Sequence, residues 1–446
     1  MSKPLHNHEV PETPGLSPHL HDVLAELHRR PYPHVPNPPR CSRRASVALI
    51  LRVKPTYQDQ PESSRLAVDQ SLSVEEQLQS FFSQSWVQHG DPEVLFIKRA
   101  SREGDRWNGH VALPGGKRDP EDLNDFTVAI RETAEEIGLD LTTDDVISVG
   151  NLPERVITTS WGAEPIMVLC PYIFLTTRSD CITLNLQPTE VAAVHWVPLR
   201  ALLSPSLRSK EYVDMSQRFT RQGGYFSRLV VRSLMGWMQF SAVRLLPSES
   251  HLSASTMGFT YDSFRGPVSL WSRFKAWILS NQADSGDPSR PLLLWGLTLG
   301  VLADFLDMLP PHNAVALWEY PTFTAPDLRL IVSILTSPLR KYNAQEVRFG
   351  YRSPDTAVDS ETSALRVTRG DDDANHDPNA VGIGGLGVGR YYGPTDRQGE
   401  GSSYAVGIML RGYYQRLRVA IWVFLAWRMT LGSAAAWTAW RYLRRR

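Results

Sequence analysis

The sequence predicts an α/β sandwich, because strand-like runs lie on both sides of one acidic helical segment. These runs are apolar, rich in β-branched residues and of ordinary strand length. Further strand-like runs and a late apolar helix follow the acidic segment along the chain. Strands that frame helices in this order are typical of domains in which helices cover the faces of a sheet.

The predicted elements follow in chain order. The strands are "RASVALILRV" (44–53), "EVLFIKRA" (93–100), "EPIMVLCPYIFLTT" (164–177), "EVAAVHWVPL" (190–199) and "GFTYDSF" (258–264). A short helix is expected within residues 74–84, and an apolar helix within 291–309 that Pro310 and Pro311 stop. A last helix begins at Pro326, a residue suited to a first helical turn.

The organisation predicted from these elements has five parts. Residues 1–43, rich in proline and histidine, are expected to be a disordered leader, and residues 344–408 a disordered Asp/Gly-rich linker. Residues 44–310 form the domain, with a helical insertion at 204–257 that contains "YFSRLVVRSLMGWMQF". Residues 311–343 are a helical extension, and 409–446 a basic C-terminal helix.

The composition limits which partners and which cellular compartment we expect. The 446 residues carry 47 Lys and Arg against 47 Asp and Glu, so the net charge gives no reason to expect nucleic acid as a partner. Three scattered cysteines have no paired spacing, which favours reduced thiols in an intracellular protein. The first residues lack the apolar core of a secretory signal.

The C-terminal helix contains an apolar run at 419–440 of about the length that a membrane span requires, roughly 20 residues. Arg428 lies near its middle, where a charge costs roughly 2.5 to 3.5 kcal/mol, so insertion is marginal. Four tryptophans and the "RYLRRR" end favour a membrane anchor, without indicating orientation or organelle. A buried or partner-binding helix is the alternative.

The candidate metal-binding and phosphate-binding residues lie in the acidic segment at 113–139. Glu132, Glu135 and Glu136 stand at i, i+3 and i+4, which places three carboxylates on one helical face. Such hard oxygen ligands suit Mg²⁺ or Mn²⁺, which also bridge to substrate phosphates. Before the helix, "LPGGK" predicts a tight glycine turn that exposes backbone N–H groups to a phosphate-bearing ligand. Gly138 fits the left-handed position that ends a helix.

This segment resembles the Nudix box, G-x5-E-x7-R-E-U-x-E-E-x-G-U. The second half of the box matches at Arg131, Glu132, Glu135, Glu136, Gly138 and Leu139, with Thr133 at an aliphatic position. One extra residue separates Gly116 from Arg131, and Asp122 lies beside the place of the first glutamate. That shift, the run "IKRASREGDRWNGHVALPGGKRD" and "LWGLT" (294–298) resemble the coenzyme A diphosphatase branch of the family.

The resemblance implies a Nudix α/β/α sandwich with a mixed sheet. It also implies hydrolysis of a nucleoside diphosphate-linked small molecule, coenzyme A or an acyl-CoA compound first, with Mg²⁺ or Mn²⁺ as cofactor. The expected metal ligands are Glu132, Glu135 and Glu136, and the expected substrate-loop residues are Gly115, Gly116 and Lys117. The expected catalytic set is Glu135, Arg131 and Glu190.

Several roles stay open at this level. Arg131 is expected to fix the helix by pairing with a loop carboxylate such as Asp122, and Glu190 to act as a fourth ligand or base. Lys117 either reaches a phosphate or is a solvated lysine. The alternative functions are a membrane-tethered nucleotide-binding or scaffold module without turnover, and hydrolysis of oxidised nucleoside triphosphates or ADP-sugars.

Overall fold

The fold is described from a computed structural model of the 446-residue chain. The structure describes residues 15–39, 41–57, 59–61, 69–100, 109–158, 164–180, 182–214, 231–253, 291–314, 318–349 and 405–445. The predicted strand at 258–264 and Cys181 therefore lie outside the described residues.

A mixed sheet forms the centre of the domain. Its main path runs β11 (Glu249–Leu252), β8 (Val191–Pro198), β2 (Asp91–Arg99), β1 (Arg44–Lys54), β7 (Pro165–Thr176), β5 (Val146–Asn151). Short strands β3 (Val111–Ala112), β4 (Gly115–Lys117) and β6 (Arg155–Thr158) pair with β2, β1 and β7. β1 and β7 are parallel, whereas β1 and β2 are antiparallel. The predicted α/β fold with a mixed sheet is confirmed, and so are its four long strands.

Helices cover both faces of this sheet. On one face, Ala129 and Ile137 of α4 (Asp125–Ile137) join a buried cluster with Ile97 and Trp196. On the other face lie α1 (Leu16–Arg29), α2 (Val74–Phe82) and α9 (Gly296–Asp307), whose apolar side chains bury the opposite side of the same strands. A four-residue helix, α3 (Ser85–Gln88), follows α2, and α5 (Leu199–Leu203) follows β8. The alternation of side chains along each strand thus separates two cores.

The prediction of a disordered leader is wrong for the part of it that the structure describes. Residues 16–29 form helix α1, and Leu20, Leu24 and Leu27 have no exposed surface. These leucines recur every three to four residues, so they fall on one face that packs on the sheet. The dense prolines that suggested disorder follow this helix. Residues 1–14 lie outside the described part.

The insertion contributes β9 and β10 to a second, smaller sheet. β10 (Met238–Arg244) pairs with β9 (Arg208–Val213), β12 (Leu293–Trp295) and β13 (Thr322–Phe323). The predicted helix in the insertion is therefore wrong from Met238 onward, although residues 231–235 are helical. Pairing with three partner strands decides the conformation here, because each pairing satisfies backbone groups that an isolated segment would satisfy within a helix.

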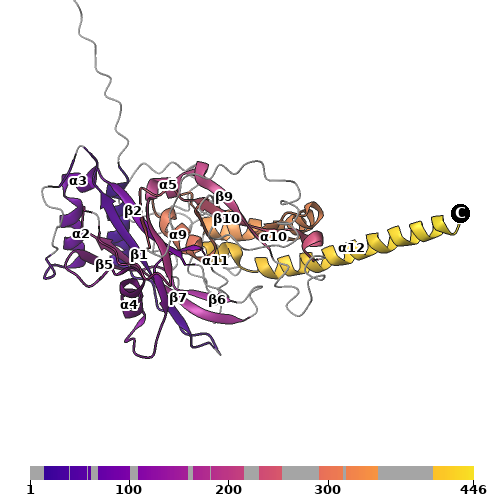
Figure 1. The fold of residues 1–446 in the computed structure, drawn as a ribbon, viewed down its shortest axis with the longest axis horizontal. Helices are drawn as coiled ribbons and strands as arrows, with labels where there is room; N and C mark the ends of the chain where they lie inside the picture. Colours follow the sequence, from indigo (N-terminus) through magenta and orange to yellow (C-terminus); the bar gives the residue numbers. More distant parts are fainter. Residues whose placement is uncertain are drawn as a thin grey trace, which may run out of the picture.

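The C-terminal helices belong to the folded body only in part. α10 (Pro326–Phe349) begins at the predicted proline and continues beyond residue 344, so the predicted linker starts too early. α11 (Ala405–Leu410) and α12 (Tyr413–Leu443) return the chain to α10, and residues 350–404 lie outside the described part. Figure 1 shows α12 leaving the body and extending away from it. One face of its first half is buried, and its second half is exposed.

Candidate active site

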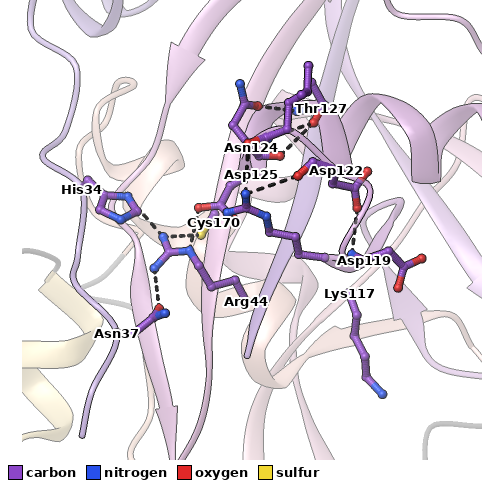
Figure 2. Close-up of polar contacts among 12 residues, drawn as sticks. His34, Asn37, Arg44, Lys117, Asp119, Asp122, Asn124, Asp125, Thr127 and Cys170 are labelled. Carbon is purple, nitrogen blue, oxygen red and sulfur yellow. Dashed lines mark hydrogen bonds and ion pairs between the residues drawn. The ribbon is translucent and has the colours of Figure 1, made fainter. Parts of the chain in front are cut away.

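The first turn of α4 is fixed to the sheet by a buried ion-pair network. Asn124 caps the helix, since its side chain accepts a hydrogen bond from the Thr127 backbone N–H at 2.9 Å. Asp125 accepts a bond from Arg44 Nε of β1 at 2.6 Å, and Arg44 also donates to Glu154 at 2.7 Å. Figure 2 shows Arg44 among its partners beside this capped turn. The network fixes where the helix starts relative to the central strand.

The last turn of α4 is fixed by a loop that leads into β8. Gly138 ends the helix with φ 70°, the left-handed conformation that was predicted for it. The backbone N–H groups of Asn185 and Gln187 donate to the carbonyls of Ile137 and Glu136, both at 2.9 Å. The same loop continues to Glu190, directly before β8. The helix end and Glu190 are therefore held together by main-chain hydrogen bonds.

The two glycines before the helix form a short strand, so the predicted tight turn is wrong. Gly115, Gly116 and Lys117 pair with Val47, Ser46 and Ala45 of β1. The Gly115 N–H donates to Glu136 Oε2 at 2.9 Å, so in this structure it holds a helix carboxylate rather than facing a ligand. A Cβ on Gly116 would lie 2.3 Å from Glu132 Cδ, which shows how closely that carboxylate covers the strand.

Arg131 ties the helix to the preceding loop. Its Nε and one terminal nitrogen contact the two oxygens of Asp122, each at 3.0 Å, a bidentate pair. The same guanidinium reaches Glu135 Oε2 at 3.0 Å and Glu132 Oε1 at 3.1 Å. The hydrogen bond from Arg131 holds the pKa of Asp122 below its ordinary value. The expected pairing of Arg131 with a loop carboxylate is thus present, and it partly offsets the crowded negative charge of the helix.

Burial and mutual repulsion disfavour ionisation of two helix carboxylates. The pKa of Glu136 is raised to about 8, mainly by burial, with smaller contributions from the charges of Glu132 and Glu190. The pKa of Glu132 is also raised, first by burial and then by the neighbouring charges of Glu135 and Glu190. These groups gain most from a nearby cation, because a positive charge would stabilise their ionised forms.

Glu190 lies close enough to the helix carboxylates to act on both electrostatically, although 54 residues separate it from Glu136 in the sequence. Arg99, at the end of β2, acts in the opposite sense and lowers the pKa of Glu136. Sequence reasoning did not single out Arg99. Its side chain alternates with Phe96 and Lys98 and shares the face of Leu95 and Ile97, which is the face that α4 covers. That alternation is the signal that could have placed it.

The other two predicted residues lie at the margin of this group. The side chain of Glu135 is 58% exposed and pairs with Arg131. Lys117 is exposed, and in Figure 2 its side chain points away from Asp119 and Asp122. The structure therefore brings Glu190 near Glu132 and Glu136, which contact β4, and leaves Glu135 and Lys117 toward solvent.

The donor set fits a hard divalent cation. It consists of carboxylates that are crowded, partly buried and incompletely compensated by Arg131, which is the environment that Mg²⁺ or Mn²⁺ would relieve. Elsewhere in the described part of the chain, ligand atoms of His34, Asp125 and Glu154 lie within 4.8 Å of one another. There the Arg44 guanidinium already contacts both carboxylates, so the charge is compensated without a metal.

Comparison with known proteins identifies the protein family. The NUDIX domain family model matches residues 85–219, which include β4, α4 and Glu190. The mitochondrial coenzyme A diphosphatase NUDT8 of Mus musculus is 43% identical over 186 residues, 40% of this chain and 78% of that protein. The chain belongs to the Nudix hydrolase family. Members of this family act on diphosphate-linked substrates and typically use a divalent metal.

Two further relatives of this Nudix hydrolase are similar over different lengths. An uncharacterized protein of Schizosaccharomyces pombe is 30% identical over 320 residues, 70% of this chain and 79% of that protein. An uncharacterized Nudix hydrolase, NudL, of Photorhabdus laumondii is 33% identical over 133 residues, 30% of this chain and 65% of that protein. The similarity to the Schizosaccharomyces pombe protein thus extends well beyond the residues that match the NUDIX domain.

Proposed function

We propose that this Nudix hydrolase cleaves the diphosphate of coenzyme A or of an acyl-coenzyme A compound. The observation that carries the proposal is the meeting of Glu190 with Glu132 and Glu136 of α4, in a chain that is 43% identical over 186 residues to a coenzyme A diphosphatase. Arg99 adds a cation beside these carboxylates. A cation there could contact a substrate phosphate, which would otherwise be repelled by the acidic cluster.

The chain's own residues have distinct proposed roles. Glu132, Glu135 and Glu136 would hold Mg²⁺ or Mn²⁺, which when bound would neutralise phosphate oxygens and acidify a water. Glu190 accepts the proton of the attacking water. The water oxygen forms a new bond to one phosphorus, and the bridging P–O bond breaks with its electron pair passing to the leaving phosphate. Arg131 acts through Asp122 and the helix as a positioning residue.

The first experiment tests turnover directly. The full chain is incubated with Mg²⁺ or Mn²⁺ and, separately, coenzyme A, ADP-ribose and oxidised dGTP, and products are identified by mass. Metal-dependent release of 3′,5′-ADP and phosphopantetheine is expected from coenzyme A. Glu135→Gln should abolish it. Glu121→Gln, a change at an exposed carboxylate of the preceding loop, should not.

Two other outcomes would contradict the proposal that coenzyme A is the substrate. Cleavage of ADP-ribose or oxidised dGTP without cleavage of coenzyme A would replace the proposed substrate with one of its rivals. A folded sample that binds Mn²⁺ but releases no product from any of the three would contradict the coenzyme A proposal, and would favour a nucleotide-binding module without turnover.

The role of Glu190 is tested by Glu190→Gln. A general base contributes roughly 10²- to 10⁴-fold to a rate, so a fall of that size in kcat is expected if Glu190 takes the proton. Mn²⁺ affinity, measured by calorimetry, should change little. A large loss of Mn²⁺ affinity would instead assign Glu190 as a fourth metal ligand.

We also propose that α12 attaches the protein to a membrane. The helical stretch Val406–Leu443 has a mean hydropathy of 1.4 in its most apolar window, and 17% of that window is buried. Four tryptophans and the arginines near Leu443 match the aromatic and basic flanks of membrane helices. Flotation of the full chain with phosphatidylcholine vesicles tests the attachment. Recovery of all protein in the unfloated fraction would contradict it.

A further inference from the structure

The α10–α12 hairpin gives the exposed half of α12 a rigid base. Leu328 and Val332 of α10 share a buried cluster with Leu417 and Phe424 of α12. The helices are antiparallel, because Asp327 at the start of α10 pairs with Arg428. At the other end, Asn343 donates to the carbonyls of Met409 and Arg411, 2.9 and 3.0 Å away. α12 therefore leaves the body at the tip of α10.

Both helices expose large apolar side chains just before that exit. On α10, Leu330 and Ile334 are 61% and 63% exposed. On α12, Trp422 and Val423 are 68% and 45% exposed. We call these four residues the collar. Leu330 and Ile334 are four residues apart, so they lie on one face of α10, and that face differs from the one that packs on α12.

The length of α12 decides whether the collar takes part in membrane attachment. The part beyond Arg428, from Met429 to Leu443, is roughly 21 Å long at 1.5 Å per residue. This is shorter than the hydrocarbon core of a bilayer, about 30 Å. Measured from Trp422, the same helix reaches roughly 32 Å, which matches the core.

From this match we infer that the collar enters the membrane together with α12, so that the tip of α10 is a second membrane-contacting element. The inference rests on the membrane attachment proposed above. It adds that lipid acyl chains contact Leu330 and Ile334 of α10. The enzyme is then fixed to the bilayer in one orientation by a helical hairpin, because α12 is packed on α10 up to the point of entry.

The charges near the collar agree with this placement. Arg428 Nε donates to Asp327 Oδ2 at 2.6 Å, and a second nitrogen reaches Oδ1 at 3.1 Å. This pairing neutralises the arginine that made insertion of the isolated helix marginal. Arg418 and Arg441 are roughly 35 Å apart along the helix, which places one near each headgroup layer. Exposed Arg329 has a side chain long enough to reach the nearer headgroups.

The first test measures where α10 lies relative to lipid. A single cysteine is introduced by Leu330→Cys, Ile334→Cys or Tyr342→Cys in the full chain carrying Cys181→Ser; Cys41 and Cys170 are buried. Each cysteine is labelled with an environment-sensitive dye. Tyr342 is the matched control, because it is 57% exposed on the same helix near its other end. With vesicles, dyes at 330 and 334 should shift to shorter wavelength and be quenched by nitroxide-labelled acyl chains, while the dye at 342 should not.

Three outcomes would overturn the inference, and they differ in what else they affect. If the full chain floats but the dyes at 330 and 334 stay in water, attachment stands and the collar does not enter the bilayer. If the full chain does not float at all, the proposed attachment fails as well. If these dyes shift without vesicles and in proportion to protein concentration, the collar is an interface with a second copy.

The second test isolates the ion pair. Asp327→Asn leaves Arg428 unpaired and should lower the vesicle-bound fraction at limiting lipid roughly tenfold or more, given the cost of a central arginine. Asp327→Asn combined with Arg428→Gln should restore binding. If the double variant binds no better than Asp327→Asn alone, the pair does not enter the membrane and the inference is overturned.

Discussion

Gly115 and Gly116 are adjacent in β4 but constrain the site in different ways. At Gly115, φ is +147° and a Cβ would lie 2.2 Å from the Ser46 carbonyl oxygen, which is backbone and cannot move aside. At Gly116 the nearest atoms belong to the end of the Glu132 side chain, which can rotate away. One glycine is therefore required by the fold and the other by the position of a carboxylate.

Gly115→Ala and Gly116→Ala should consequently give different results. Gly115→Ala is expected to lower the midpoint of urea unfolding substantially, because strained backbone conformations of this kind cost on the order of 1–3 kcal/mol before the clash is counted. Gly116→Ala should leave that midpoint nearly unchanged but weaken Mn²⁺ binding by displacing Glu132. Equal loss of stability in both variants would contradict this distinction.

The contribution of Arg131 to stability can be tested with a substitution that keeps the positive charge but changes the geometry of the side chain. Lysine cannot make the bidentate contact with Asp122, so Arg131→Lys should destabilise the protein by about 1.5–3 kcal/mol, the range for hydrogen bonds to charged groups. Asp122→Asn should have a similar effect. The double variant should cost less than the sum, since both changes remove the same contact. Strict additivity in urea unfolding would show that the pair does not support the helix.

Among elements, β8 contains a buried histidine that makes stability depend on pH. His195 Nδ1 lies 2.8 Å from the Ser250 hydroxyl of β11, and burial, followed by the charge of Lys98, lowers its pKa to about 4. In the unfolded chain the pKa of histidine is about 6.5. The folded state therefore binds fewer protons, so the stabilisation is fully present above pH 6.5 and is lost as pH falls toward 4.

The expected contribution of His195 is on the order of 3 kcal/mol between pH 6.5 and pH 4. His195→Gln keeps a polar partner for Ser250 but does not titrate, so the difference in unfolding midpoint between this variant and the wild type should change across that window. Parallel profiles for wild type and His195→Gln would refute the linkage.

Helices and strands could be predicted from the sequence where one local sequence signal was much stronger than the others. The strands β1, β2, β7 and β8 have buried, β-branched runs, and α4 has an N-cap asparagine and a C-terminal glycine. β10 was missed because an apolar, amphipathic stretch is compatible with a helix until its three partner strands are known. α1 is not predicted from the sequence because its leucine periodicity is short and the dense prolines that follow it suggest disorder.

At the scale of the whole molecule, the C-terminal region has two parts. Its first part packs into the fold, and the rest of α12 extends away from it. Tyr413, Leu417, Ile421 and Phe424 are buried against α10 and β13, and Val406 and Ile408 against α9. Burying each large apolar side chain is worth roughly 1.5–3 kcal/mol, so together they are comparable to the entire stability of a domain.

Two shortened chains test this dual role. A chain ending at Asn343 lacks α11 and α12 and should be insoluble or bind hydrophobic dyes. A chain ending at Thr430 keeps the part of α12 that packs on α10 and the Asp327–Arg428 pair, and should be monodisperse, active and unable to float with vesicles. A soluble and active chain ending at Asn343 would show that the C-terminal helices are dispensable for folding.

The sequence by itself determined the local features of the protein. Helix spacing placed Glu132, Glu135 and Glu136 on one face, the Nudix box indicated a metal-dependent hydrolase, and the apolar tail predicted a long helix, because these signals depend on residues close together in the chain. Tertiary structure decided the rest. The meeting of Glu190 and Arg99 with α4, the carboxylate contact of Gly115 and the pairing of Asp327 with Arg428 each join distant segments, and only packing brings such segments together.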